Sequence, residues 1–415
     1  MEYQKKSNKS NKFISRTSKA ILAVVFLLSV IGVMTVYSAS LHTGKPFFQN
    51  AGGKQLIRMI IGLFMGIFVF FIQKKFLFEK AYWFYGIGIG LILLPYLLGA
   101  DGTGTSRWLN FGGINFQPSE LMKIIMVLAV AKNLSNTELS PKTFKVFIIP
   151  VVMTLIPTAI ILKQPDLGTS MILVFSLFPM LYWAETRLFH IFLIIAPVIS
   201  VLTAFNFYTF FIWVILLGLI LYFTQERWVL LVVLFLLNLS LGFTTPIIWN
   251  NLHSYQQNRI LTMFNVEADP QGAGYQVIQS QVAIGSGGVW GKGFGQGTQT
   301  HLKFLPEQHT DFIFSVLGEE WGFVGVSVVL LLYFLLIILS FQTASKLKDK
   351  FSSLVVVGLT SILFFHVIIN IAMTVGLMPV TGLPLPFLSY GGTFVLTCSL
   401  IIGLILNMSV VKTRY

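Results

Sequence analysis

The sequence predicts an all-α, polytopic membrane protein. Hydrophobic residues make up 55% of its 415 residues, only 10% are charged, and the mean hydropathy is +0.81. A soluble protein of this composition would expose far too much apolar surface. Many stretches are continuously apolar over the length of a membrane helix, whereas the strands of a membrane β-barrel would alternate apolar and polar residues. We therefore expect a helical bundle in the membrane.

The apolar stretches predict about twelve transmembrane helices. They lie at residues 20–39, 56–73, 81–99, 119–134, 145–162, 167–184, 187–204, 206–223, 227–247, 311–341, 353–378 and 391–411. The stretches between 187 and 247 are so closely spaced that one pair could instead form a re-entrant hairpin or lie along the interface. Residues 1–19 precede a long first apolar stretch that no small-residue cleavage site interrupts, so we expect them to form an uncleaved cytoplasmic tail.

The distribution of charge predicts the orientation. If the N-terminus is cytoplasmic and the spans alternate, most of the 28 Lys and Arg residues fall on the inner side, and most acids fall on the outer side. Both termini are then cytoplasmic, and the net charge of +13 needs no nucleic acid to explain it. We expect a cytoplasmic tail (1–19), N-terminal transmembrane helices (20–247), a long extracytoplasmic loop (248–310), C-terminal transmembrane helices (311–411) and a short cytoplasmic tail (412–415).

Two outer segments carry polar residues beside predicted helix starts. In the segment 102–120, Arg107 and Trp108 are either an interfacial anchor or substrate-binding groups, and the next helix begins at Pro118. Glu120 and Lys123 share one face of that helix and form either a structural ion pair or a functional pair. The functional interpretation is favoured, because charged groups inside a membrane are costly. Asp166 follows a second Gln-Pro pair and either caps the next helix or joins the other charged groups in one cavity.

The long outer loop contains the stretch ADPQGAGYQ at 268–276. Asp269 there is either ordinary turn chemistry or a general base, and Lys292 lies in the glycine-rich run that follows, where backbone N–H groups can face an anion. Glu319 and Glu320 lie inside the next helix and need a partner such as Lys123. A later segment, 376–392, is rich in Pro and Gly and is a candidate pocket rim, because irregular backbone at membrane depth must be buried or line a cavity.

Metal or thiol chemistry is not predicted. The single cysteine, Cys398, excludes a disulfide framework and a thiolate metal site, and the loop histidines His301 and His309 have no partners at metal-ligand spacing. The run Gly291-Lys292-Gly293 lacks the Ser or Thr that a phosphate-binding loop of the Walker type requires.

Four stretches, taken together, resemble the SEDS family (shape, elongation, division and sporulation), the group of RodA, FtsW and SpoVE proteins. They are SRWLNFGGINFQPSELMK, QPDLGTS, the run from ADPQGAGYQ to GEEWGFVG, and GLMPVTGLPLPFLSYGG, and they follow one another in the family order. The stretch GTQTHLKFLPEQHTDFIFSVLGEE is closer to the elongation branch than to the division branch. The family usually has ten spans, so the expected twelve imply an extra helical pair around 187–247, which leaves the orientation of Asp269 unchanged.

The resemblance implies a peptidoglycan glycosyltransferase that polymerises lipid II on the outer face of the cytoplasmic membrane. The essential loop aspartate of the family falls on Asp269, its outer-loop tryptophan on Trp108, its cavity Glu and Lys on Glu120 and Lys123, and its second cavity aspartate on Asp166. An α-linked donor and a β-linked product imply inversion by single displacement, with Asp269 as the base.

The resemblance also has implications for ligands and partners. Arg107, Lys123, Lys292 and the glycine-rich run are candidates to hold the leaving pyrophosphate, with a divalent cation such as Mg²⁺ or Mn²⁺ compatible but not required. A class B penicillin-binding protein is the expected partner, with other membrane proteins of the elongation complex compatible. Two rival functions remain. A lipid II flippase or other transporter would suit the number of spans but leaves the long outer loop unexplained, and a scaffold would need no acid in a glycine-framed turn.

Overall fold

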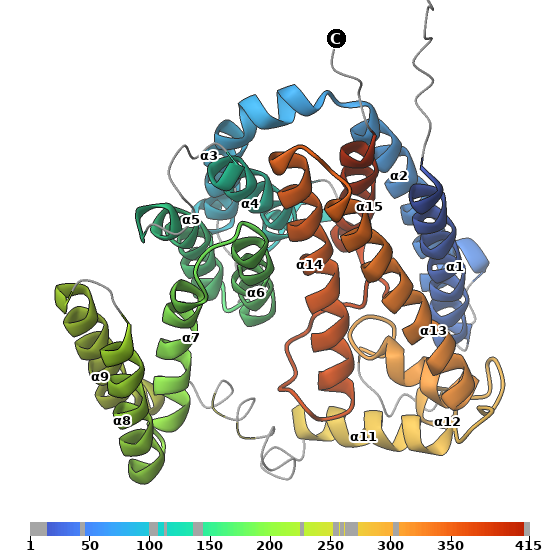
Figure 1. Ribbon diagram of the computed structural model, residues 1–415. Coiled ribbons are helices and arrows are strands. Elements are labelled where there is room, and N and C mark those ends of the chain that lie inside the picture. The colour runs from blue at the N-terminus through green and yellow to red at the C-terminus, as the bar shows by residue number, and fades with distance from the viewer. Residues whose placement is uncertain are drawn as a thin grey trace, which may run out of the picture.

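The protein is described by a computed structural model that covers residues 15–41, 46–98, 107–111, 114–135, 144–224, 228–251, 257, 261, 273–301 and 307–410. Its long helices (Figure 1) are α1 (Arg16–Ala39), α2 (Ala51–Phe71), α3 (Lys74–Leu98), α4 (Pro118–Ser135), α5 (Phe144–Lys163), α6 (Leu167–Trp183), α7 (Leu188–Thr203), α8 (Phe207–Phe223), α9 (Trp228–Asn250), α13 (Ile313–Ser345), α14 (Lys350–Thr374) and α15 (Gly392–Ser409). Shorter helical elements are η2 (Phe47–Gln49), α11 (Ala273–Ser286) and α12 (Thr298–His301). A small antiparallel hairpin, β1 (Leu109–Phe111) and β2 (Ile114–Phe116), departs from the all-α expectation.

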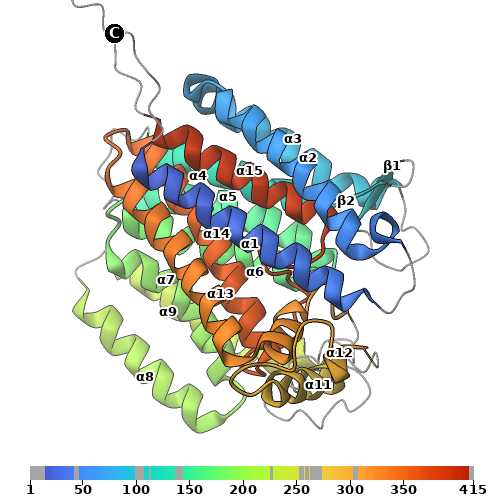
Figure 2. The same cartoon turned by 90° about the vertical axis from the view of Figure 1, so that its right-hand side faces the viewer.

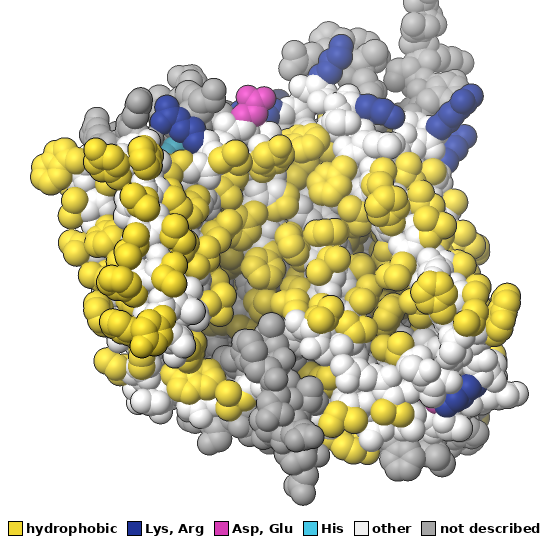
Figure 3. Space-filling model, turned by 60° about the horizontal axis from the view of Figure 1, so that its bottom comes forward, with side chains coloured by type: hydrophobic (Ala, Val, Ile, Leu, Met, Phe, Trp, Pro, Cys, Tyr) yellow, Lys and Arg dark blue, Asp and Glu magenta, His cyan; other side chains and the backbone are white. Residues whose placement is uncertain are grey.

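Each apolar stretch predicted from the sequence coincides with one of the long helices. Within the described residues, seven helices are long and apolar enough to cross a membrane, and α6, α7, α8 and the described part of α5 are shorter apolar helices. Figure 3 shows hydrophobic side chains over the face in view and most of the visible Lys and Arg along its upper edge. Large exposed side chains such as Phe64 and Phe68 would be costly in water but suit contact with lipid. The chain is a multi-pass membrane protein.

The helices surround α14, which is buried along most of its length and packs against α4, α6, α13 and α15. On one side, α2 crosses α15 at very short range because both helices carry glycine at the crossing. A Cβ on Gly403 would lie 2.4 Å from the carbonyl oxygen of Gly66, so only glycine fits. The start of α1 and the end of α15 lie together, with the Ser18 and Ser409 hydroxyls 3.0 Å apart.

The helices α7, α8 and α9 form a lobe that projects from the rest of the bundle in Figure 1, and Figure 2 shows α8 set apart along the edge of the molecule. The lobe has its own small core around Trp213 and is attached to the body through α6 and α7. Its helices are joined by hydrogen bonds among Trp213, Ser200 and Asn238, at 2.8 and 2.9 Å. This lobe is the part of the chain where the sequence predicts an extra helical pair.

The segment between α14 and α15 is non-helical, as its Pro and Gly content predicts, and residues 385–389 in it are buried. Its backbone carbonyls are satisfied by side chains from surrounding helices: Tyr333 donates to the Pro386 carbonyl at 2.6 Å, and Gln55 donates to the Ser389 carbonyl at 2.8 Å. Phe387 in this segment also lines a cavity, which agrees with the expected pocket rim. Irregular backbone therefore persists at membrane depth because protein groups replace the missing helical hydrogen bonds.

Candidate active site

Gln117 joins the starts of three helices. Its backbone N–H donates to the Thr393 hydroxyl at 3.2 Å, at the start of α15, and its side chain donates to Asp166 at 2.9 Å, at the start of α6. Gln117 itself directly precedes α4. Because a helix N-terminus carries partial positive charge and unsatisfied N–H groups, three starts in one place favour an anion.

Asp166 serves as the N-cap of α6, as one of the two sequence interpretations predicts. One carboxylate oxygen accepts from the Thr169 backbone N–H at 3.1 Å, and the other accepts from Gln117. The side chain is buried, and its charge is close enough to act on Glu120. The cap and the approach to the other charged residues therefore occur together, so the two interpretations of Asp166 are compatible.

Glu120 and Lys123 form a fully buried ion pair on the first turns of α4. The ammonium donates to Glu120 at 2.9 Å, and a second contact at 2.8 Å joins it to the Nε2 atom of His366 on α14. Both charged side chains are almost inaccessible to solvent. Among the described residues, the second carboxylate oxygen of Glu120 has no hydrogen-bond partner. A buried ion pair in a membrane protein, with one Glu120 oxygen that lacks a hydrogen-bond partner among the described residues, is a candidate functional centre.

Arg107 and Trp108 precede the hairpin. Arg107 donates through Nε to the Gln164 carbonyl at 2.7 Å and through its guanidinium to the Pro165 carbonyl, so it satisfies the backbone at the turn between α5 and α6. Trp108 is exposed. Arg107 thus fixes the turn that presents Asp166, a role that its position in the sequence did not indicate.

Lys292 lies in a second polar cluster, together with Thr298, Gln299 and Glu319. It donates to Glu319 at 2.7 Å, and the same carboxylate oxygen accepts from the Gln299 backbone N–H at 2.9 Å. Glu320 instead accepts from the Ser38 hydroxyl on α1. Glu319 thus has the cationic partner that its depth in the helix predicts, but the candidate named from the sequence, Lys123, was wrong, because Lys123 contacts Glu120 and His366 instead.

Asp269 lies outside the described residues. The described chain resumes at α11, which is tied to the bundle: the Ser280 hydroxyl donates to the Thr374 carbonyl at 2.6 Å, and Gln281 donates to the Val375 carbonyl at 2.9 Å. The long loop thus contains an ordered helix anchored at the end of α14, close in sequence to Asp269.

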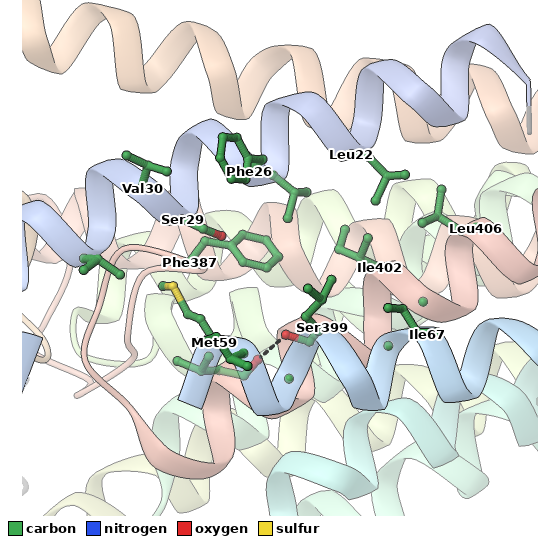
Figure 4. Close-up of a pocket in the computed structure, with 18 of the residues that line it drawn as sticks. Leu22, Phe26, Ser29, Val30, Met59, Ile67, Phe387, Ser399, Ile402 and Leu406 are labelled. Carbon is green, nitrogen blue, oxygen red and sulfur yellow. Dashed lines mark hydrogen bonds between the residues drawn. The ribbon is translucent and has the colours of Figure 1, made fainter. Parts of the chain in front are cut away.

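The cavity in Figure 4 lies elsewhere, between α1, α2 and α15. Its volume is 820 Å³, and its lining is almost wholly apolar, with Phe26, Ile67 and Ile402 among the labelled side chains. The hydroxyl of Ser399 faces it but is bonded to the Val395 carbonyl at 3.0 Å. This cavity offers no acid or base. Within the described part of the chain, no group of three or more His, Cys, Asp or Glu side chains is arranged to hold a metal ion.

Sequence reasoning missed His366 and Gln117 as partners in this region. His366 and Asn370 stand one turn apart in a largely apolar helix, a polar pair that could have indicated an inward face. Gln117 belongs to the first of two Gln-Pro pairs, which predict helix starts on the same face but not the contact between the Gln117 side chain and Asp166.

Comparison with known proteins places these features in a family. The model of the FtsW/RodA/SpoVE family, described as "Cell cycle protein", matches residues 18–211 and 206–414. Peptidoglycan glycosyltransferase MrdB of Escherichia coli is 35% identical, over 94% of this chain and 92% of that protein. A solved structure described as "Structural coordination of polymerization and crosslinking by a peptidoglycan synthase complex" has a TM-score of 0.70, with 27% identity over 94% of this chain and 97% of that one. RodA of Thermus thermophilus has a TM-score of 0.60, with 26% identity over 94% and 95%. The chain belongs to the SEDS family of FtsW, RodA and SpoVE proteins.

Proposed function

We propose that this peptidoglycan glycosyltransferase polymerises lipid II into glycan strands during cell elongation, with Asp269 as the general base. The observation that carries the proposal is its similarity to proteins of that activity over 94% of the chain, together with the buried Lys123–Glu120 pair at the meeting of three helix starts. The elongation role is favoured because MrdB is 35% identical to this chain, whereas two FtsW relatives are 31% and 32% identical.

The chemistry is a single displacement. The 4-hydroxyl of an acceptor GlcNAc attacks the anomeric carbon of the donor MurNAc, its proton passes to the Asp269 carboxylate, and the donor's C–O bond to pyrophosphate breaks. A positioned carboxylate contributes about 10²- to 10⁴-fold to such a step. The configuration at the anomeric carbon inverts, and no covalent sugar–enzyme intermediate forms.

The leaving pyrophosphate requires fixed positive groups. Lys123 and the N-termini of α4, α6 and α15 supply them within one region, in surroundings where electrostatic stabilisation exceeds that in water. Arg107 contributes by holding the turn before α6. Trp108 and Lys292 remain predicted substrate contacts, Trp108 at the exposed rim and Lys292 through the glycine-rich loop. A divalent cation on the pyrophosphate would add further charge, and no step here depends on it.

The proposed topology has twelve spans, with both termini in the cytoplasm and the site on the outer side. The basic edge in Figure 3 and the proximity of Ser18 to Ser409 support a common side for the two ends. The protein would then lie in the cytoplasmic membrane. We further propose a class B penicillin-binding protein as partner, because the structural neighbour is described as part of a synthase complex that couples polymerisation to crosslinking.

The test is polymerisation by the purified protein in detergent, together with its penicillin-binding partner. Labelled lipid II is incubated with the wild type, with Asp269→Asn and with a control, Glu79→Gln, whose carboxylate is exposed at the opposite end of the bundle. Moenomycin is added to inhibit contaminating glycosyltransferases of the other class. Ladders from the wild type and control, and none from Asp269→Asn, are expected.

The other outcomes assign different roles. Equal ladders from all three proteins would remove Asp269 as the base and direct attention to Glu120 and Asp166. If no protein forms ladders while lipid II crosses vesicle membranes that contain the wild type, the protein is a flippase. If neither polymerisation nor transport occurs but the partner's crosslinking depends on the chain, the protein is a scaffold.

A further inference from the structure

His366 is a buried histidine whose two ring nitrogens both have partners. Nε2 lies 2.8 Å from the ammonium of Lys123, and Nδ1 lies 3.3 Å from the Pro384 carbonyl oxygen. The ring is inaccessible to solvent and packs on Phe394, with the two ring centroids 4.8 Å apart. The mechanism above makes no use of it.

These partners fix the tautomer of the imidazole. A carbonyl oxygen can only accept, so Nδ1 carries the hydrogen and donates to Pro384. Lys123 in its ammonium form can only donate, so Nε2 offers its lone pair. His366 is therefore a neutral acceptor that leaves the single positive charge on Lys123, 2.9 Å from the Glu120 carboxylate.

The contact restricts a flexible side chain. Lysine has a four-carbon stem and a compact charge, so its ammonium needs external contacts to hold one position. Glu120 and His366 engage two of its three N–H groups from different helices, which fixes the direction of the third. His366 is in turn held by the Pro384 carbonyl, which belongs to the non-helical segment between α14 and α15 (hereafter the irregular segment). The neighbouring Leu383 carbonyl accepts from Asn370 at 2.7 Å.

We propose that His366 is a positioning residue that aims the Lys123 ammonium at the leaving pyrophosphate. The inference rests on the proposed function for its chemical meaning, but the Lys123–His366 contact can be tested separately. His366 acts through Lys123 and touches no substrate. The irregular segment, through Pro384, becomes part of the apparatus that orients the cation.

Two substitutions separate hydrogen bonding from packing. His366→Phe keeps a ring against Phe394 but loses both hydrogen bonds, whereas His366→Gln can accept from Lys123 through its oxygen and donate to Pro384 through its nitrogen. A matched control is Thr360→Val, because Thr360 is buried on the same helix and its hydroxyl has no hydrogen-bond partner in the described structure.

The first measurement is steady-state polymerisation of lipid II. We expect His366→Phe to lower kcat by roughly 10²-fold with little change in KM, the usual effect of a misplaced catalytic contact. The kcat of His366→Gln should lie within a few-fold of the wild-type value, and the kcat of Thr360→Val should equal the wild-type value. Full activity of His366→Phe would overturn the proposal, and together with a loss in His366→Gln it would favour ring packing. Equal losses from both variants would also overturn it, because the hydrogen bonds that Gln can restore would then have no effect on polymerisation. An inactive wild type would instead contradict the proposed function.

The second measurement needs no substrate. The melting temperature in detergent is compared for the wild type, His366→Phe, Lys123→Met and the double variant. If His366 acts through Lys123, His366→Phe lowers Tm in the wild type but has little further effect in the Lys123→Met background. Equal losses in both backgrounds would show that the two residues are independent and would refute the positioning role, whatever the activity of the protein.

Discussion

Removal of Lys123 alone should destabilise the protein far more than removal of the whole ion pair. The ammonium and the Glu120 carboxylate are 2.9 Å apart, and both side chains are almost fully buried. At an effective dielectric constant of about 20, their attraction is about 6 kcal/mol. Desolvation of the two charges offsets much of this gain, so the pair as a whole contributes little net stability.

The single variant Lys123→Met leaves the Glu120 carboxylate buried without its cation. This should cost about 3–5 kcal/mol, the usual effect of breaking a buried pair on one side. The double variant Lys123→Met with Glu120→Gln removes both charges and should recover most of that stability. Neither protein should form glycan, because both lack the ammonium that we assign to the pyrophosphate.

Thermal unfolding in detergent, followed by tryptophan fluorescence, measures the first effect, and glycan ladders from lipid II measure the second. Lys75→Met is the control, because its pair with Glu79 spans 3.8 Å on the surface, and such pairs contribute little. The prediction is wrong if the double variant is as unstable as the single one, or if the single variant has the same melting temperature as the wild type. A stable double variant that still polymerises would remove Lys123 from the site.

Two further predictions follow from contacts in the bundle. Gly403→Ala places a Cβ 2.4 Å from the Gly66 carbonyl oxygen, so α2 and α15 must separate. We expect the protein to lose about 1–3 kcal/mol of stability. The control is Gly90→Ala, where the Cβ meets open space and the melting temperature should not fall. Asp166→Ala removes the cap of α6 and the contact to Gln117, so the protein should lose about 1 kcal/mol of stability. The polymerisation rate should fall by more than this loss of folded protein explains. If Asp166 were only a helix cap, the substitution would lower stability alone.

The elements that depend on local chemistry could be predicted from the sequence. A membrane helix needs an apolar run of fixed length, so the runs locate the long helices, and Pro118 and Asp166 mark two helix starts by their own residue types. Their location on the same side was also predictable, since the alternation of spans determines it, but the contact between them through Gln117 and Asp166 was not. The extra helices around Trp213 were visible as apolar runs, but the formation of a separate lobe was not.

The pairings across the bundle could not be predicted in this way. His366 and Lys123 are 243 positions apart, and nothing in either neighbourhood specifies the other. Glu319 was assigned the wrong cation because the sequence gives its depth in the helix but not its direction. The sequence around Arg107 does not indicate that its guanidinium binds the carbonyls of Gln164 and Pro165, which only the structure shows. Such contacts depend on helix rotation and packing, which the hydrophobic pattern of nearly uniform apolar helices leaves undetermined.

A break in α13 shows how one residue can set such a pairing. Gly322 has φ of 61°, a conformation that favours glycine, and the helix resumes beyond it. The glycine-rich loop fills the gap: the Lys292 N–H donates to the Glu319 carbonyl at 3.0 Å, and the Phe323 N–H donates to the Gly288 carbonyl at 2.9 Å. Loop and helix thus complete each other's hydrogen bonds, which brings Lys292 to the Glu319 carboxylate.

Gly322→Ala should therefore release the loop. The new Cβ would lie 2.3 Å from the Gly291 backbone nitrogen, and the positive φ adds strain, so the loss of stability should exceed about 2 kcal/mol. Limited proteolysis should cut the loop of residues 287–297 faster than in the wild type, and faster than in Gly285→Ala, where a Cβ meets open space. Unchanged cleavage would mean that the loop is held by contacts other than the broken helix. Faster cleavage with normal polymerisation would separate the Lys292 cluster from the chemistry and leave the Lys123 region as the cationic site.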